Sequence, residues 1–245
     1  PTGPPLAEVA GLQLWGRLVR RSGNIIFTMD VKNGQATAVS NFALKLNVNT
    51  FGLQPADMTV PTTAPIAPGG TGKAECTIVL SPGHTKPGPP VLAVETAMRD
   101  NTSGAVLKFN LPVDFEALFV EDGEVPQDSF IPQWTSIPEE NELETTITGI
   151  VDTNLADATH GLASVQARLS AHNIFYVAQR RLDDGQVKLY CSLKTYSGLA
   201  VLCEFTFKNG YDLCKLCLKS AQPAAGPFVR DAVENVLKRG FTPKA

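Results

Sequence analysis

The apolar residues of this chain follow two different periods, and the change between them falls near Gly123. Before that point they recur at every second position within short runs, as in IIFTMDVK at residues 25–32. This alternation is typical of a strand that buries one face. After it, strand-like runs are mixed with segments whose apolar residues lie three or four apart, as in amphipathic helices. We therefore expect two regions of different architecture.

The first region is predicted to be all-β. Turn-forming clusters such as Asn33-Gly34 and Pro68-Gly69-Gly70 separate its alternating runs, and no segment of three helical turns fits between them. Short, regularly spaced strands without helices are typical of an immunoglobulin-like sandwich. We expect this β-sandwich over residues 1–120, with strands at residues 12–19, 25–32, 42–48, 76–80, 91–97 and 106–113.

The second region, residues 121–245, is predicted to be an α+β platform, in which helices flank an antiparallel sheet. Asp128 is expected to cap a short helix over residues 129–136 that carries Trp134. Gly240 is expected to end the last helix. The other helices are expected at residues 162–171 and 227–238, and strands at residues 142–150, 174–182, 187–195, 199–207 and 211–218.

Hairpin geometry predicts which side chains meet across this sheet. A three-residue loop at 196–198 places Tyr190 opposite Glu204, and a similar loop at 184–186 places Arg180 opposite Tyr190. The row from Arg180 to Glu204 would then cross three strands on one face. A slip of one residue would break the row, because it moves every side chain to the other face. The alternative interpretation is an ordinary solvated row of polar residues.

Composition excludes several classes of function. The net charge of −3 and a pI near 5.7 argue against a nucleic-acid-binding platform, because phosphate contacts need a basic surface. No apolar run approaches the roughly 20 residues of a membrane helix. The three histidines lie far apart without a partner pattern, so we expect no catalytic residues and no cofactor. The chain begins at Pro1 and is interpreted as a C-terminal piece of a longer protein.

The five cysteines fall inside apolar segments and are expected to be buried, reduced thiols. Cys214 and Cys217 form a CxxC pair, but the sequence has no second pair of ligands at similar spacing. Residues three apart on a strand also face opposite sides of the sheet. We therefore predict no metal site.

The segment that joins the two regions, FVEDGEVPQDSFIPQWTSIPEENEL at 119–143, places Trp134 among carboxylates. A large aromatic side chain offers contact area at low entropic cost, and carboxylates select a cation. This combination favours a docking surface for a short basic and aromatic peptide. The alternative is a purely structural module in which Trp134 is a packed core residue.

Three motifs carry a resemblance to a known family: FVEDG at 119–123, the W-x-x-I-P-x-E-N-E-L run from Trp134 to Leu143, and YCSLK at 190–194 followed by Glu204. They resemble the appendage, or ear, domain of the β-adaptin subunits of clathrin adaptor complexes. The sandwich half also resembles this family, in the segment NTFGL at residues 49–53. The resemblance implies a sandwich followed by a platform and a protein that is not an enzyme.

The resemblance also implies a peptide-binding groove. Trp134 and Tyr190 match its aromatic centre, and Glu142, Glu204 and Arg180 match its charged surround. The expected ligand is a short helical motif with Phe, Leu and Arg, in which Phe packs on the aromatic pair. Its arginine would meet the two glutamates, and its acidic residues would meet Arg180.

The implied partners are accessory and endocytic proteins, clathrin, and other adaptor subunits reached through an N-terminal trunk. The implied location is cytoplasmic, peripheral on clathrin-coated membranes of either the plasma membrane or the trans-Golgi and endosomes. The sequence leaves open which adaptor complex is concerned. The family can carry a second site on the sandwich, centred on a tyrosine, but Val106 occupies the roughly matching position here.

Overall fold

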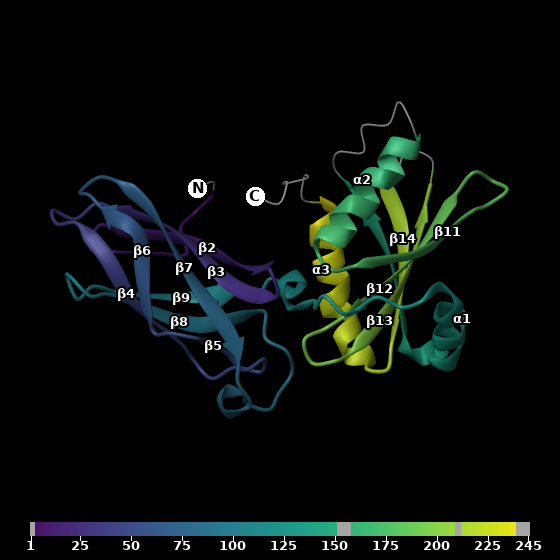
Figure 1. Cartoon of the computed structure of the whole chain (residues 1–245), viewed down its shortest axis with the longest axis horizontal. Coiled ribbons are helices and arrows are strands. Elements are labelled where there is room, and N and C mark those ends of the chain that lie inside the picture. The colour runs from purple at the N-terminus through teal and green to yellow at the C-terminus, as the bar shows by residue number, and fades with distance from the viewer. Residues whose placement is uncertain (1–2, 151–157, 209–211, 239–245) are drawn as a thin grey trace. The chain divides into compact units, whose positions relative to one another are not determined.

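The computed structural model describes residues 3–150, 158–208 and 212–238. The chain divides into two compact units, Pro1–Asp114 and Phe115–Ala245. The boundary predicted from the sequence, between residues 120 and 121, lies slightly further along the chain than the observed one, which falls between Asp114 and Phe115. Each unit has its own sheet (Figure 1).

The first unit is a β-sandwich, as predicted. One layer pairs β1, β2, β3, β7 and β5, and the other pairs β6, β4, β8 and β9. Strand β6 also pairs with β7 at Thr62 and Ala74, which links the two layers. The strands are β1 (Ala7–Val9), β2 (Leu12–Arg21), β3 (Asn24–Asn33), β4 (Val39–Leu46), β5 (Leu53–Pro55), β6 (Thr59–Ile66), β7 (Thr71–Leu80), β8 (Ala93–Asp100) and β9 (Val106–Pro112).

The alternation in the sequence correctly predicts the sandwich core. Every second residue of β3 from Ile25 to Val31 is buried, and so are Phe42, Leu44 and Leu46 of β4. The expected continuation to Val48 is wrong, because β4 ends at Leu46 and Val48 is 46% exposed.

The sequence pattern does not predict strand β6, since its sequence TVPTTAPI contains two prolines, which cannot donate to a ladder. The short strands β1 and β5 also fall outside the predicted set.

The second unit is a five-stranded antiparallel sheet with helices on both faces, again as predicted (Figure 1). The strand order is β10-β14-β13-β12-β11. Its strands are β10 (Glu142–Thr148), β11 (Phe175–Arg181), β12 (Val187–Lys194), β13 (Ala200–Phe207) and β14 (Leu213–Ser220). Its helices are α1 (Gln127–Ser136), α2 (Ala158–Ala171) and α3 (Gly226–Lys238). The residue expected to end α3, Gly240, lies outside the described residues.

Helices α2 and α3 cover one face of this sheet and enclose the main core of the unit. Four of their inward-facing residues, Val165, Leu169, Val233 and Val236, are each 1% exposed or less. Cys214 lies in the same core, whereas Cys217 contacts Glu144 on the opposite face, as their spacing predicts. All five cysteines are buried and free.

Helix α1 lies on the other face and begins two residues earlier than predicted. Pro126 occupies its N-cap position and no side chain caps it, so the prediction that Asp128 is the N-cap is wrong. Asp128 instead lies in the first turn, where a negative charge interacts favourably with the helix dipole. Among the described helices, none is long and apolar enough to span a membrane.

Candidate functional site

Helix α1 is anchored to the sheet by Phe130. This side chain is 2% exposed and packs with Val177 and Leu202 in a small apolar cluster. Its ring lies 5.7 Å from the ring of Trp134 in a stacked arrangement and 5.4 Å from Tyr190 in an edge-on one. Phe130 therefore supports both aromatic residues that the sequence analysis singled out, although sequence reasoning did not assign it a role.

The segment before α1 is also attached to the sheet. The backbone N–H of Val125 donates a 3.0 Å hydrogen bond to the hydroxyl of Ser192 in β12. Gly123 lies so close to β12 that an added Cβ would stand 2.5 Å from the backbone nitrogen of Lys194. This close approach requires glycine at position 123.

One predicted cross-strand pair is confirmed and the other is wrong. Tyr190 lies directly opposite Glu204. Arg180 lies opposite Lys188, and Ala178 takes the place opposite Tyr190. The reason is the hairpin loop, which spans residues 183–185 and is closed by a 2.8 Å hydrogen bond from the Leu182 N–H to the Gln186 carbonyl. The register differs from the prediction by two residues, so Arg180 still projects on the same face as Tyr190.

We call the side of the sheet that α1 partly covers the α1 face. Side chains project to it at every second position of each strand, and the pairing registers align these positions in rows. All five predicted site residues are on this face or on α1. The sheet residues of the α1 face include Glu142, Glu144, Lys215, Cys217, Lys219, Leu202, Glu204, Thr206, Lys188, Tyr190, Ser192, Ala178 and Arg180.

Trp134 is half-buried rather than sealed inside the unit. Besides the contact with Phe130, its ring lies 5.3 Å from the Nζ atom of Lys219, a distance suited to a cation–π interaction. The same ammonium lies 3.4 Å from the carboxylate of Glu142. Glu142 is thus connected to the indole through Lys219, a residue that the sequence analysis did not identify.

The other carboxylates of the α1 face are also paired with lysines. Glu204 accepts a 2.6 Å hydrogen bond from Lys188, and Glu144 lies 2.6 Å from Lys215. The hydrogen bond with Glu204 raises the pKa of Lys188. Burial, followed by the Glu204 charge, raises the pKa of Tyr190.

Arg180 differs from these lysines. It is exposed, and no ion pair joins it to another of the described residues. The three lysine partners could have been found only from the strand registers, because the chain carries many lysines and only a few project to this face.

Glu142, Glu144 and Cys217 come within 4.8 Å of one another, a spacing that could hold a metal ion. Their charge is already compensated, since Lys219 and Lys215 pair with the two carboxylates. Burial, with the two carboxylates adding to it, raises the pKa of the Cys217 thiol to about 11. The cluster is therefore better described as part of the ion-pair network of the α1 face.

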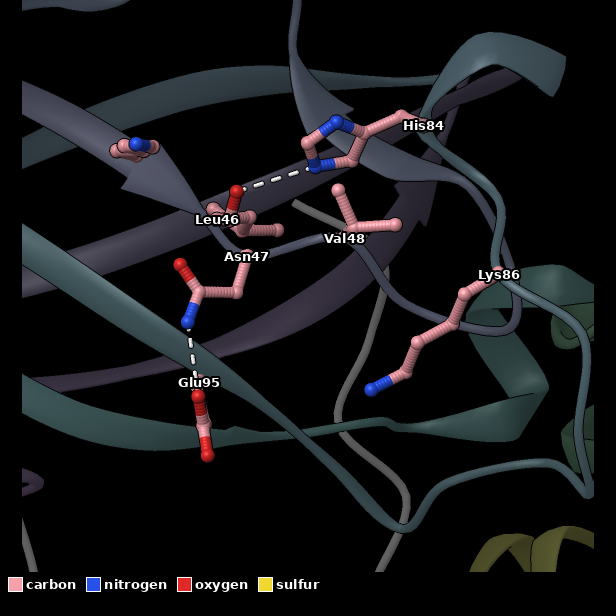
Figure 2. A pocket seen from close by; sticks show the side chains of 7 residues that line it. Leu46, Asn47, Val48, His84, Lys86 and Glu95 are labelled. Carbon is pink, nitrogen blue, oxygen red and sulfur yellow. Dashed lines mark hydrogen bonds between the residues drawn. The ribbon is translucent and has the colours of Figure 1, made fainter.

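The sandwich has a separate open pocket of about 410 Å³, which contains none of the predicted site residues (Figure 2). Its polar groups largely satisfy one another. The Nε2 atom of His84 lies 3.1 Å from the Leu46 carbonyl oxygen, and the Asn47 amide donates to Glu95 at 2.8 Å. Val106 lines a second, smaller pocket of about 220 Å³ on the same unit.

Comparison with known proteins agrees with this architecture. Residues 120–237 match the family model described as the beta2-adaptin appendage, C-terminal sub-domain. The chain is 31% identical to human AP-1 complex subunit beta-1 over 96% of its length, which covers 24% of that protein. It is 25% identical to the AP-1 complex subunit beta of Dictyostelium discoideum over 86% of its length and 21% of that protein.

The chain thus spans about a quarter of the length of the curated relatives that it matches. The likeness to the human protein runs through both units, and the family model covers the helices and the sheet that form the α1 face. The sandwich followed by a helix-flanked platform is the architecture that the resemblance implied. This chain therefore belongs to the β-adaptin appendage family.

Proposed function

We propose that the α1 face is a docking site for short helical peptides that carry a phenylalanine. The main support for this proposal is the arrangement of three aromatic side chains. Phe130 is buried, while Trp134 and Tyr190 beside it remain half-exposed. Two part-exposed rings on a rigid support offer apolar contact area that needs no reordering when a ligand binds. An incoming phenyl ring would pack between them.

The charged residues around these rings would orient the peptide. Glu142 and Glu204 are the groups that would meet a basic residue of the ligand, and Arg180 is the group that would meet an acidic one. Each is at the rim of the aromatic pair by register. Rim charges of this kind contribute to specificity and orientation more than to affinity.

We further infer that the domain serves a clathrin adaptor β subunit in vesicle-mediated transport. In that role it would capture accessory and endocytic proteins, and it could also contact clathrin. The remaining adaptor subunits would be reached through the part of the protein to which this domain is attached. It would act in the cytoplasm, at the surface of coated membranes, as a binding module rather than as an enzyme. The support is family membership and the AP-1 complex names of the relatives.

A single aromatic anchor with exposed charges implies weak binding, with a dissociation constant on the order of micromolar. Weak sites of this kind become effective when many domains and many motifs act together on one coat. Rapid exchange between partners would then be an advantage.

Intrinsic fluorescence provides a direct test. The chain has two tryptophans, so Trp15→Phe leaves Trp134 as the only indole. We expect a synthetic helical peptide of about 15 residues with one phenylalanine to change the emission of Trp134 saturably and to protect it from iodide quenching. The matched peptide with alanine in place of phenylalanine should leave both signals unchanged.

Two results would contradict the proposal. If iodide fails to quench Trp134 in the unbound protein, the indole is a packed structural residue. If the phenylalanine and alanine peptides give the same titration, the aromatic pair does not recognise a phenyl ring.

A further inference from the structure

We propose that the sandwich unit carries a basic surface that contacts membranes containing anionic phospholipids. This surface is the outward side of strands β4, β8 and β9, which we call the β8 face. The contact is peripheral and electrostatic, and it orients the domain on a membrane near which the protein is already held. No residue of the α1 face takes part, so the inference does not depend on the proposed peptide docking.

Three cations project from nearby positions of the β8 face. Lys45 of β4 and Lys108 of β9 lie on either side of Ala97 of β8, in one row across the three strands. Arg99 lies two residues after Ala97 and therefore projects on the same side, in the next row. All three cations are exposed. The spacing of strands and residues in a sheet places their Cα atoms within roughly 10 Å of one another.

Lys45, Arg99 and Lys108 form no ion pair among the residues that the structure describes. The hydrogen bond from Arg99 to the Asn101 side chain is 3.5 Å long and involves a neutral group. Like charges on neighbouring strands are unfavourable, and an anion placed over them would relieve the repulsion. The β8 face therefore complements a negatively charged partner.

A fourth cation extends this array beyond the strands. Lys86 lines the same open pocket as Lys45, and its side chain extends from its loop towards the strands that carry Asn47 and Glu95 (Figure 2). Glu95 also projects on the β8 face, where the Asn47 amide donates to it at 2.8 Å. The four cations and this carboxylate give the face a net charge of +3, in a chain whose net charge is −3. A negative surface therefore attracts this face and repels the remainder of the chain.

The arrangement of the cations favours an extended negative surface over a compact anion. They are distributed along three strands and a loop instead of converging on one point, so a layer of anionic head groups can meet them all at once. Beside them, Ala43, Ala97 and Val106 line a hollow of about 220 Å³ together with Met58, which is 66% exposed. A flexible, unbranched methionine can enter the boundary between head groups and acyl chains. Cations around an exposed apolar side chain are suited to a peripheral membrane contact.

The expected attraction is weak. Each basic residue beside an anionic leaflet strengthens binding by about fivefold, so four of them opposed by Glu95 give half-saturation on the order of millimolar accessible lipid. Such an attraction does not recruit a free protein. It orients a domain that is tethered near a membrane, because tethering raises the effective concentration. Salt should weaken it, since the Debye length falls from about 8 Å at physiological ionic strength to about 3 Å at 1 M.

The test measures how much of the 245-residue chain floats with lipid vesicles as the lipid concentration is raised. One set of vesicles is phosphatidylcholine alone, and the other contains about 30 mol% phosphatidylserine. The variant that tests the β8 face combines Lys45→Gln, Arg99→Gln and Lys108→Gln. These side chains are exposed, so the variant should keep the thermal unfolding midpoint of the unaltered chain.

A matched control removes the same charge from the other layer of the sandwich. It combines Arg17→Gln, Lys32→Gln and Lys73→Gln, which replace exposed cations on the outward side of β2, β3 and β7. The two variants have the same net charge and differ only in the face that is altered. A synthetic acidic peptide of about 15 residues, titrated against the same three proteins, tests for a soluble partner in place of a membrane.

We expect the unaltered chain to float with the phosphatidylserine vesicles and not with phosphatidylcholine alone. The Lys45, Arg99 and Lys108 variant should bind about 100-fold more weakly, whereas the control variant should bind within about threefold of the unaltered chain. Added salt of about 0.5 M should abolish the binding.

The inference is overturned if the two variants bind equally, because net charge rather than the β8 face would then explain the attraction. It is also overturned if phosphatidylcholine alone binds as well, or if no vesicle binds. If the acidic peptide binds through these cations while the vesicles do not, the face is a peptide site and the membrane contact is rejected. Each of these results leaves phenylalanine-dependent binding at the α1 face untouched, since that binding is measured separately.

Discussion

Trp134→Ala is expected to weaken binding of a phenylalanine-bearing helical peptide by about 30-fold to 100-fold, the range typical of an aromatic anchor at the centre of a small interface. The indole is one of the two part-exposed rings of the α1 face, and no other described residue could replace its area beside Phe130. The loss should appear mainly as faster dissociation, because the rim charges that guide encounter are unchanged. Calorimetry and surface-based kinetics measure both quantities.

The fold should survive this change. Trp134 is only half-buried, and Phe130, which anchors α1 to the sheet, remains in place. Lys219 loses its contact with the ring but retains Glu142 as a partner. The thermal unfolding midpoint should therefore fall by only a few degrees, with an unchanged circular dichroism spectrum at about 25 °C.

A matched control lies on the same helix. Ile131 is 60% exposed and is not part of the Phe130 cluster, so Ile131→Ala removes apolar surface from α1 without altering the aromatic pair. The dissociation constant of this variant for the peptide should lie within about twofold of that of the unaltered chain. Equal binding by the Trp134→Ala protein would show that the peptide docks elsewhere, whereas an equal loss in Ile131→Ala would place the contact on the outer side of the helix.

The fold could be predicted because it depends on local patterns. Period-two alternation indicates which side of β3 and β4 is buried, and the change of period after Gly123 separates the sandwich from the platform. The failures also have local causes. Strand β6 contains prolines that disfavour a strand, and the helix that carries Trp134 begins without the side-chain cap that Asp128 suggested.

The candidate site was predictable only in part, because it depends on register. The predicted loop at 184–186 and the observed loop at 183–185 both contain Asp184 and Gly185, so turn chemistry does not distinguish them. The predicted register was wrong by two residues. Because this is an even number, Arg180 still projects on the predicted face. Its neighbour across the ladder is Lys188 rather than Tyr190, which changes the charge distribution on the α1 face.

The role of Phe130 was missed for a different reason. In the run SFIPQW, nothing distinguishes Phe130 from Ile131 until the start of the helix is known, since one residue of rotation decides which side chain faces the sheet. In the structure Phe130 is 2% exposed and Ile131 is 60% exposed. The buried residue therefore supports the site, and the exposed one is the natural control.

Phe130→Ala is accordingly expected to have the largest effect on stability, lowering the free energy of unfolding of the platform unit by about 3 to 5 kcal/mol. The substitution leaves a cavity between α1 and the sheet, where the ring now contacts Val177 and Leu202. It also removes the ring against which Trp134 and Tyr190 pack, so peptide binding should fall even where the variant remains folded. Phe130→Leu fills most of the space and should therefore lose much less stability and much less peptide affinity.

Urea denaturation distinguishes this expectation from a general loss of stability. The two units have separate cores, so the sandwich should keep its own transition midpoint while that of the platform moves to lower urea. Hydrogen exchange would add spatial detail, with faster exchange in α1 and the neighbouring strand β11 than in β2 or β3. A Phe130→Ala protein as stable as the unaltered chain would mean that α1 is held by contacts other than this ring, and the aromatic pair would then lack the rigid support on which its binding role depends.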